Sequence, residues 1–444
     1  MKRRTFIKAA LQGTAAACSA TAALGQGENV LGANERVNVG LIGCGTRGMT
    51  VARLMRQVPN VAFVAACDVY DRNADAARQW AGKGCQTYRD FRQVLARKDV
   101  HAILVATPDH WHAIPTILAC QAGKDVYVEK PLAHNIREGR AMVAAARMHN
   151  RIVQCGMQHR SAEHYREAER IVQSGELGKV RFVRVWNSNN IYPNGIGRPA
   201  NAMPPAGLDW DFYLGPAPQV PFNRGRFLGS FRWFWDYAGG FLTDWGTHRL
   251  DSVRQVLHAG PPLSVAAIGG RYDLNDGAET PAILQVAYEF SDFVLSYESN
   301  QCNGHGVGGQ TPNRSYYRAR GTEDRPHGEA FYGTNGTLYS DRLGFEIYPE
   351  PAAAGRRRLE RREVNGQDRT DLHVRNFIEC VRSRQRPVAD VEIGHQSTIL
   401  PLLGNIAFRT GRKLHWNADQ EQIVGDAQAA ALLGRTARAP WNVI

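Results

Sequence analysis

Short apolar segments rich in β-branched residues alternate with longer amphipathic segments through the first third of the chain. Each apolar segment has the length and unbroken hydrophobic character of a strand that is buried on both faces of a sheet. These segments are residues 37–42, 61–67, 102–106, 125–128 and 152–154. Segments of helical character lie between them. They are residues 49–57, a stretch after the third strand that ends at residue 122, and residues 135–149. The alternation predicts an α/β domain with a doubly wound parallel sheet.

The turn after the first predicted strand is rich in glycine and opens the helical segment that follows. In a strand–turn–helix setting, the three glycines of a G-x-G-x-x-G turn permit a tight turn, a close approach of backbone to a pyrophosphate, and close packing of helix on strand. Free amides at the helix N-terminus favour negatively charged phosphates. The pattern alone is weak evidence, but its position predicts a dinucleotide site. Its residues are Gly43, Gly45, Thr46, Arg47 and Gly48.

An acidic residue follows the second predicted strand. Asp68 lies 25 residues after Gly43 (68 − 43), near the spacing of about 20 expected for the group that hydrogen-bonds the ribose hydroxyls. A carboxylate there repels the extra phosphate of NADP, so the sequence favours NAD. Arg72, four residues later, leaves NADP open as the less favoured cofactor, because a nearby arginine can accommodate that phosphate.

Polar residues also follow the third and fourth predicted strands. Thr107 and His110 come after residues 102–106, and Glu129 and Lys130 come directly after residues 125–128. Ligands of open α/β sheets bind beyond the carboxyl ends of the strands. We therefore expect these four side chains at the edge of the cofactor site.

The second half of the chain contains a distinctive segment, residues 239–251. If it is helical, Asp244 and His248 are four residues apart and share one face. A carboxylate can fix the orientation and tautomer of an imidazole that transfers a proton. A purely structural pair is the alternative from the residues alone, and Asp251 could simply cap a turn.

These motifs together resemble the glucose–fructose oxidoreductase, inositol dehydrogenase and MocA (Gfo/Idh/MocA) family. The resemblance rests on the glycine turn 43–48, on Thr107-Pro108 with His112, and above all on Glu129-Lys130-Pro131. It covers the chain from about Asn34. It implies an N-terminal Rossmann domain and a C-terminal α+β domain built on a large, mostly antiparallel open sheet that covers the nicotinamide.

The resemblance also implies roles for individual residues. Lys130, Asp244 and His248 would form the catalytic group, with His248 taking the proton of a hydroxyl. Further cofactor contacts would come from Pro108, His110, His112 and Gln158. Substrate contacts would come from Arg160, Tyr192, Arg232, Trp235 and Tyr237, in addition to the catalytic pair. Within residues 231–237, however, stacking against a sugar ring and packing in a core are equally compatible with the aromatic run.

The N-terminus has the features of a twin-arginine export signal. Residues 2–8, KRRTFIK, place paired arginines before phenylalanine, an apolar residue and lysine, and a weakly apolar segment follows up to residue 24. That segment is too short for a membrane span, which needs about 20 strongly apolar residues. We expect a signal peptide at 1–26 and export to the periplasm by the twin-arginine machinery. A cytoplasmic protein with an accidental basic start is the alternative.

The expected domain division follows from these segments. The Rossmann domain would span 34–156, and a substrate and oligomerisation domain would span 157–444. The last helical segment would pack back on the first domain. From the resemblance, we expect a homo-oligomer formed through the open sheet.

Composition excludes several classes of protein. Hydrophobic residues make up 43% and charged residues 22%, which is ordinary globular usage. The net charge is +12, and +8 without the first 26 residues. The densest arginine run, at 356–362, lacks interleaved aromatics, so a solvated turn is expected there and no nucleic-acid partner. No C-x-x-C pair occurs among the eight cysteines, and we expect no metal site and no stable membrane insertion.

The motifs favour an oxidoreductase that acts on a secondary hydroxyl of a sugar, cyclitol or sugar derivative. An exported enzyme has no supply of free NAD, so the cofactor should be tightly held and regenerated in each cycle. Oxidation of one sugar coupled to reduction of another meets that need. The alternative is an NAD-dependent glycosidase that works by transient oxidation, elimination, water addition and re-reduction. A sugar-binding protein without catalysis is a third reading, which the presence of Lys130, Asp244 and His248 disfavours.

Overall fold

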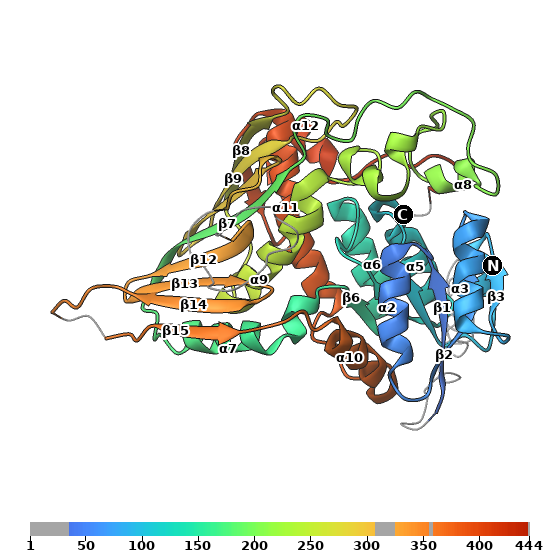
Figure 1. The fold of residues 1–444 in the computed structure, drawn as a ribbon, viewed down its shortest axis with the longest axis horizontal. Coiled ribbons are helices and arrows are strands. Elements are labelled where there is room, and N and C mark those ends of the chain that lie inside the picture. Colours follow the sequence, from blue (N-terminus) through green and yellow to red (C-terminus); the bar gives the residue numbers. More distant parts are fainter. Residues whose placement is uncertain (1–34, 307–324, 355–357, 443–444) are drawn as a thin grey trace, which may run out of the picture.

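The computed structural model describes residues 35–306, 325–354 and 358–442 (Figure 1). Its first sheet contains six parallel strands in the order β3-β2-β1-β4-β5-β6. The strands are β1 Val37–Ile42, β2 Val61–Cys67, β3 Gln86–Tyr88, β4 Ala102–Val105, β5 Asp125–Val128 and β6 Val153–Cys155. All residues of β1, β4 and β5 are buried, which explains their unbroken apolar sequences. The doubly wound Rossmann sheet is thus confirmed.

Helices connect these strands and cover the sheet. They are α2 Thr46–Arg56, α3 Asp71–Ala81, α4 Phe91–Leu95, α5 Ala113–Gln121 and α6 Ile136–Met148, with a short 3-10 helix η2 at Asp109–Trp111. The helix after the glycine turn begins three residues before the predicted position, because Gly45 already serves as its N-cap. The turn therefore leads directly into the helix, as a phosphate cradle requires.

The second sheet has eleven strands, in the order β15-β14-β13-β12-β7-β10-β9-β8-β16-β17, with β11 paired to β7. Among the described strands of this sheet, only the β7–β10 pair is parallel, so the mostly antiparallel open sheet is confirmed. The strands are β7 Val180–Asn190, β8 Ser264–Gly270, β9 Ile283–Glu289, β10 Val294–Asn300, β11 Cys302–Asn303, β12 His327–Gly333, β13 Gly336–Asp341, β14 Gly344–Pro349, β15 Arg362–Asn365, β16 Leu414–Asn417 and β17 Gln422–Val424.

Three helices pack against the face of this sheet that looks toward the first domain (Figure 1). They are α7 Glu163–Gln173, α9 Thr247–Leu257 and α11 Val391–Thr410. Alternate residues of β9, such as Leu284 and Val286, are buried in the core with Leu250 and Leu403. The period of two in β9 is the sign of a sheet with one covered face.

Shorter helices link these layers and border the space between the domains. They are η3 Gln158–Ser161, α8 Trp210–Leu214, η4 Arg224–Arg226, η5 Leu228–Trp233, the π-helical turn η6 Leu242–Gly246, α12 Ala427–Ala430 and η7 Ala431–Leu433. The segment that contains α8 arches over the first domain (Figure 1). Leu208 in this segment forms an isolated β-bridge with Tyr70, directly after the second strand of the Rossmann sheet.

The return of the chain to the first domain differs from the expectation. The helices that pack there are α10 Thr370–Ser383, which contacts α2 through Val374, Phe377 and Ile378, and α11, which contacts α6. The last α-helix, α12, lies instead beside β17, and η7 follows it directly. The residues after it do return, but as a non-helical tail that ends with Trp441 in the first-domain core.

Some expectations fall outside the described residues or concern absences. The signal peptide at 1–26 lies outside them, as do residues 356 and 357 of the arginine run. Within the described ranges, no helix has the length and apolarity that a membrane crossing needs. No group of three or more His, Cys, Asp and Glu side chains in those ranges is arranged to hold a metal ion.

Candidate active site

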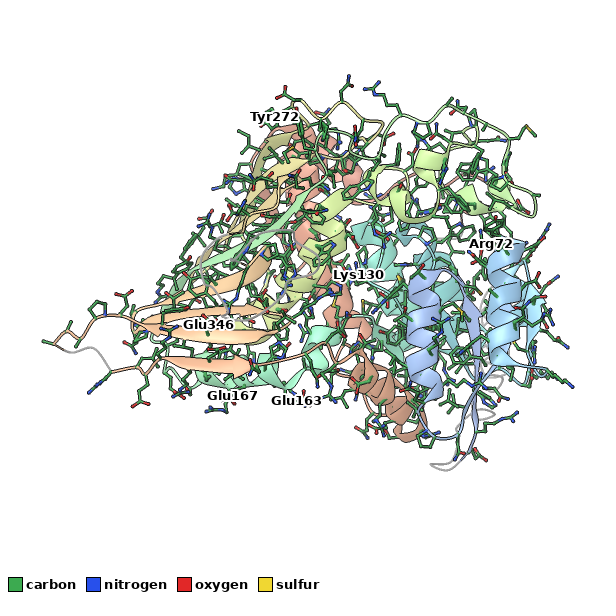
Figure 2. The ribbon with its side chains drawn as sticks, viewed as in Figure 1. Arg72, Lys130, Glu163, Glu167, Tyr272 and Glu346 are labelled. Atoms are coloured by element: carbon green, nitrogen blue, oxygen red, sulfur yellow. The ribbon has the colours of Figure 1, made fainter. Side chains whose placement is uncertain are left out.

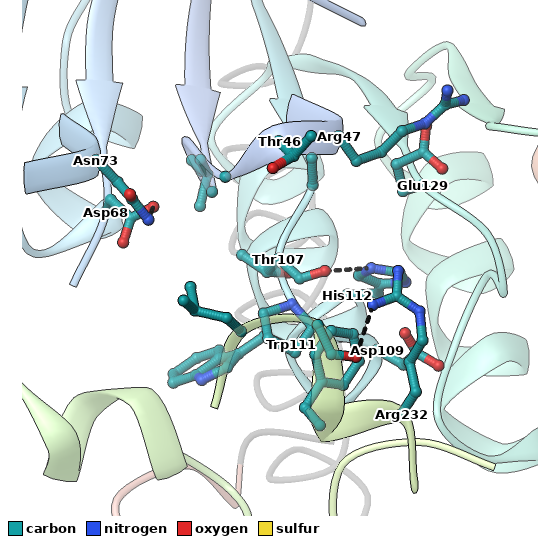
Figure 3. A pocket seen from close by; sticks show the side chains of 18 of the residues that line it. Thr46, Arg47, Asp68, Asn73, Thr107, Asp109, Trp111, His112, Glu129 and Arg232 are labelled. Atoms are coloured by element: carbon teal, nitrogen blue, oxygen red, sulfur yellow. Dashed lines mark hydrogen bonds and ion pairs between the residues drawn. The ribbon is translucent and has the colours of Figure 1, made fainter. Parts of the chain in front are cut away.

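A cavity of about 560 Å³ lies between the two domains. One wall consists of the glycine turn and the ends of β2, β4 and β5 in the Rossmann sheet (Figure 3). The opposite wall comes from η5, η6 and α9 of the second domain. The cavity is therefore at the carboxyl edge of the parallel strands, where open α/β sheets bind their ligands.

The three glycines of the turn have three different surroundings. Gly43 has φ +90°, and a Cβ there would lie 2.6 Å from the backbone of Ala106. A Cβ on Gly48 would lie 2.0 Å from the carbonyl oxygen of Gly43, so Gly48 permits close packing of α2. A Cβ on Gly45 would meet no atom within 4 Å, although Gly45 lines the cavity. These surroundings fit a dinucleotide: two glycines shape the turn and the third leaves room for a phosphate.

Asp68 lies at one end of the cavity as a half-buried carboxylate. It accepts hydrogen bonds from the backbone amides of Cys44 at 2.8 Å and Tyr70 at 2.9 Å, and from Asn73 Nδ2 at 3.3 Å. Burial raises the pKa of Asp68, and these hydrogen bonds oppose the increase. Asn73 lines the cavity, whereas Arg72 is exposed on the outer side of α3 (Figure 2). The predicted Arg72 contact is therefore corrected: the neighbour of Asp68 is Asn73.

Arg47 joins the glycine turn to the end of β5. Its Nε lies 2.8 Å from Glu129 Oε1, and its Nη2 lies 3.5 Å from Gln158 Oε1 (Figure 3). Gln158 Nε2 donates in turn to Asp368 at 3.4 Å. All four side chains line the cavity, so the predicted residues Arg47, Glu129 and Gln158 lie together.

The turn after β4 is held by His112. One ring nitrogen lies 2.7 Å from the carbonyl oxygen of Pro131 and the other lies 3.0 Å from that of Thr107. His112, Thr107 and Pro108 line the cavity, as predicted. His110 does not: its Nε2 lies 3.0 Å from the carbonyl oxygen of Tyr213 and its ring is completely buried. His110 is therefore a packing residue beneath the cavity.

Lys130 forms the chemical link between the two domains. Its Nζ donates to Asp244 Oδ1 at 2.6 Å and to the Asp244 carbonyl oxygen at 2.8 Å. Arg232 Nε lies 3.1 Å from the other carboxylate oxygen, Oδ2. Burial favours the neutral form of Asp244, but the two cations outweigh burial and lower the pKa of Asp244 below its usual range. Asp244 is therefore ionised at neutral pH.

His248 lies in the first turn of α9 and lines the same cavity. It is 5% exposed, and burial together with the nearby charges of Lys130 and Arg342 lowers its pKa well below the usual value. The ring is therefore neutral at neutral pH and able to accept a proton. Its Nδ1 is buried without a hydrogen-bond partner.

The expected Asp244–His248 pair is not formed. The segment between them is π-helical at Leu242–Gly246, so the two residues do not have the α-helical spacing on which the prediction rested. The hydrogen bonds of the Asp244 carboxylate go to Lys130 and Arg232. Asp244 therefore positions Lys130, and something else must fix the ring of His248.

Two of the predicted substrate residues lie away from the cavity because other groups or solvent surround them. Arg160 forms a bidentate ion pair with the buried carboxylate of Asp251, at 2.7 to 3.0 Å. Tyr192 is 53% exposed and lies outside the cavity lining. Neither side chain is placed to contact a ligand there.

The aromatic run 231–237 divides between cavity and core. Arg232 and Phe231 line the cavity. Tyr237 is fully buried in an aromatic core cluster, and the ring of Trp235 packs under Arg409 at 5.2 Å. Trp235 and Tyr237 therefore pack against other protein groups, which was the alternative to stacking on a sugar. The prediction that they contact substrate is corrected for both.

Several cavity residues were not predicted from the sequence. They include Asn73, Asp109, Phe231, Trp245, Arg342 and Asp368. Burial raises the pKa of Asp109 to about 7, against the opposing effect of Arg232 and Lys130. The sequence did indicate the positions of Asp109 and Trp245, since each is adjacent to a residue that was predicted to line the site. Arg342 and Asp368 lie in loops far along the chain, where no local pattern distinguishes them.

Comparison with protein families matches both domains. Residues 37–157 match the GFO_IDH_MocA model, described as an oxidoreductase family with an NAD-binding Rossmann fold. Residues 164–292 and 359–443 match its companion, the C-terminal alpha/beta domain of an oxidoreductase family. The chain belongs to the GFO_IDH_MocA oxidoreductases. Its first domain is the NAD-binding Rossmann domain of that family, and NAD is the cofactor that this membership indicates.

Individual GFO_IDH_MocA relatives are distant. The inositol 2-dehydrogenase of Salmonella typhimurium is 29% identical over 159 residues, which are 35% of this chain and 47% of that protein. The chain thus spans about half the length of the curated relatives it matches. Among solved structures, the WlbA dehydrogenase from Bordetella pertussis, in complex with NADH and UDP-GlcNAcA, has a TM-score of 0.62 at 19% identity, over 86% of this chain and 100% of that one. The aldose-aldose oxidoreductase from Caulobacter crescentus has a TM-score of 0.61 at 18% identity, over 86% and 99%.

Proposed function

We propose that the protein is an NAD-dependent oxidoreductase that acts on a secondary hydroxyl of a sugar, a cyclitol or a sugar derivative. The observation that carries the proposal is the placement of Lys130, Asp244 and a neutral His248 in one cavity with the glycine turn. This arrangement provides a hydrogen-bond donor and a base beside a dinucleotide cradle.

The residues that would hold the cofactor are on the first domain. The backbone of the glycine turn would cradle the pyrophosphate, and Asp68 would accept from the ribose hydroxyls. Thr107, Pro108, Glu129 and Lys130 would border the nicotinamide. When bound, NAD supplies the hydride acceptor. Asp68, with Arg72 turned outward, favours NAD over NADP.

Three side chains of the cavity would handle the substrate. The ammonium group of Lys130, held by Asp244, donates a hydrogen bond to the substrate oxygen and makes its hydroxyl more acidic. His248, neutral in its buried position, accepts the hydroxyl proton. Arg232 keeps the charge of Asp244 balanced, so that the carboxylate does not compete for that proton.

We further propose that NAD stays bound and is recycled within each turnover. The proposal rests on the twin-arginine pattern in residues 2–8, because an exported enzyme must keep its cofactor. Likeness to an aldose-aldose oxidoreductase is compatible with such a cycle. The relatives named above are dehydrogenases and oxidoreductases, and no observation favours the glycosidase alternative.

The first experiment is to purify the full chain without added nucleotide and to measure its ultraviolet absorbance and the NAD released on denaturation. We expect NAD to survive dialysis and its absorbance near 340 nm to increase on addition of an aldose or myo-inositol. Protein that neither retains nor binds NAD would contradict the proposal. Protein that binds NAD reversibly and turns over with free NAD would support the oxidoreductase and exclude the recycled cofactor.

Export and assembly are separate proposals. We propose that residues 1–26 direct the chain to the periplasm, which a reporter fusion with Arg3 and Arg4 replaced by lysine tests through loss of export. We also propose a homo-oligomer that uses the open face of the second sheet. Light scattering measures the mass of the assembly, and a monomeric mass would exclude the proposed homo-oligomer.

A further inference from the structure

We infer that His159 is a positioning residue for His248, and that a stack of three buried rings, rather than Asp244, fixes the orientation of the base. The inference rests on the proposed function, because it assigns a cause to the geometry of the base in that reaction. His159 lies on η3, does not line the cavity and would not touch the substrate. It acts through the ring that it supports.

The stack consists of Tyr165, His159 and His248. The ring centroids of His159 and His248 are 5.0 Å apart with an interplanar angle of 27°, and those of His159 and Tyr165 are 4.7 Å apart at 12°. Tyr165 is 0% exposed, His159 3% and His248 5%. His159 thus has an aromatic ring on either face, in the offset range that such pairs prefer.

Hydrogen bonds fix the tautomer of His159. Ser252 Oγ donates its one proton to the carbonyl oxygen of His248 at 3.0 Å, because a carbonyl can only accept. Ser252 Oγ therefore accepts from His159 Nδ1 at 3.0 Å. The other nitrogen, Nε2, accepts from Arg342 Nε at 3.1 Å. His159 is consequently a neutral ring with its proton on Nδ1, and taking a second proton would expel Arg342.

These contacts tie the stack to the second-domain wall of the cavity at two places. Arg342 lines the cavity and its guanidinium lies 5.0 Å from the ring centroid of Trp245, which also lines it. On the other side, Ser252 and His248 are four residues apart on α9. Among the described residues, the Nδ1 of His248 has no hydrogen-bond partner, so a hydrogen bond at that atom does not set its ring rotation. Face contact with His159 restrains that rotation instead.

The charges around His248 explain why the restraint matters for proton transfer. The groups that face it are Lys130 at the end of β5, Arg342 in the β13–β14 turn, Arg47 on α2 and His159 on η3. Burial is the largest cause of its lowered pKa, and each of these groups lowers the pKa further. A ring released from the stack can turn toward the water of the cavity, which relieves burial and raises its pKa toward the ordinary value.

The test compares His159→Phe, which keeps an aromatic face, with His159→Leu, which removes the ring. The matched control is His373→Leu. His373 is equally buried and makes two ring hydrogen bonds, to Ser161 and to the Cys155 carbonyl oxygen, but has no ring contact with the stack. Each full-length variant is labelled at histidine Cε1 and titrated by NMR, with the His248 signal assigned by its loss in His248→Gln. The kcat/KM for aldoses and myo-inositol is measured against pH.

We expect His159→Leu to raise the titration midpoint of His248 and to lower kcat/KM by about tenfold to a hundredfold, as a misplaced reacting group does. KM for NAD should stay unchanged. His159→Phe should remain closer to the unmodified protein in both measurements, and His373→Leu should match it. An unchanged His248 titration in His159→Leu would overturn the inference, and so would equal impairment of the Phe and Leu variants. If the unmodified protein oxidises none of these substrates, the proposed function fails, and the NMR titration still decides the role of His159.

Discussion

The Lys130–Asp244 ion pair connects the two domains inside the cavity. The side chains are 13% and 17% exposed, and the second oxygen of Asp244 is occupied by Arg232. Removing one partner of a buried pair leaves an uncompensated charge, which costs about 3–5 kcal/mol in typical cases. Here Arg232 remains beside Asp244, so the loss in stability should be smaller than the loss in catalysis.

Replacement of Lys130 by methionine tests this separation. We expect kcat to fall by about 10²- to 10⁴-fold, the usual contribution of a positioned acid–base group. NAD affinity, measured by calorimetry, should change little because the glycine turn and Asp68 are intact. Lys124→Met is the control: Lys124 is also buried, but its Nζ donates to the Arg97 carbonyl oxygen outside the cavity. Equal losses in both variants would argue against a catalytic Lys130.

The positions of residues that follow a strand could be predicted from the local sequence pattern. The positions of residues whose side chains pair with a residue far along the chain could not. Gly43, Asp68 and Lys130 follow strands directly, so the sequence pattern alone places them at the sheet edge. Arg160 lies in η3, shortly after β6, but Asp251, 91 positions away, pairs with its guanidinium. No local pattern reveals such a pairing.

At the scale of elements, the buried strands were predictable because burial on both faces leaves an unbroken apolar run. The segments at 37–42, 61–67 and 125–128 match β1, β2 and β5 to the residue. The π-helical turn at Leu242–Gly246 was not predictable, because a single extra residue in a helical turn leaves no periodic trace. Within this turn, the carboxylate of Asp244 contacts Lys130 and Arg232.

The glycine turn between β1 and α2 offers a matched pair of substitutions. In Gly45→Ala, the added methyl group meets no protein atom within 4 Å and the backbone φ is −69°, so stability should be unchanged. NAD affinity should fall at least about tenfold, a loss of about 1.4 kcal/mol. In Gly48→Ala, the methyl group meets the Gly43 carbonyl oxygen, so we expect a destabilisation of about 1–3 kcal/mol. Calorimetry and urea unfolding separate the effects, and a destabilised Gly45→Ala variant would contradict the assignment.

The C-terminal tail packs behind the part of the cavity wall that contains Trp111 and Phe212. Trp441 stacks on Phe212 with centroids 5.2 Å apart and contacts Trp111 at 4.7 Å, and both partners line the cavity. Arg438 adds hydrogen bonds to Asp211 and to the Gly215 carbonyl oxygen. The tail therefore supports the segment that contains α8 from behind.

Trp441→Ala should weaken both the fold and cofactor retention. We expect a loss of about 3–5 kcal/mol in the free energy of unfolding, as for other buried tryptophans. Release of bound NAD, followed by fluorescence during dilution, should become faster. Trp80→Ala is the control, since Trp80 packs on Phe63 away from the cavity. Faster release in the control as well would assign the effect to general destabilisation.

At the scale of the whole molecule, the fold buries many neutral histidines. The pKa is lowered, with burial as the largest cause, for His101, His110, His112, His134, His159, His164, His248, His327 and His373. Each is protonated in the unfolded chain below about pH 6.5 but stays neutral in the folded chain, so each reduces stability as pH falls. Asp109 and Glu329, whose pKa values burial raises to about 7, act in the opposite direction, and so does Asp68, whose pKa burial also raises.

The histidines outnumber these three carboxyl groups, so the free energy of unfolding should fall steadily from pH 6.5 to pH 4.5. A single histidine contributes up to about 1.4 kcal/mol per pH unit in this window. Urea unfolding at pH 8.0, 6.5, 5.5 and 4.5 measures the trend, and His373→Gln should reduce its slope. A midpoint that is constant or that increases on acidification would contradict the burial of neutral rings.

The contact of Phe91 with Trp441 also has a consequence for biosynthesis. The two residues are 350 positions apart (441 − 91), yet their rings pack at 6.3 Å in the wall that borders the nucleotide end of the cavity. A nascent chain can therefore form its parallel sheet and glycine turn while the ribosome is still translating the second domain. The wall is completed only after Trp441 has left the ribosomal tunnel. A cofactor captured earlier would occupy a cavity whose wall at Trp111 and Phe212 does not yet have the support of Trp441.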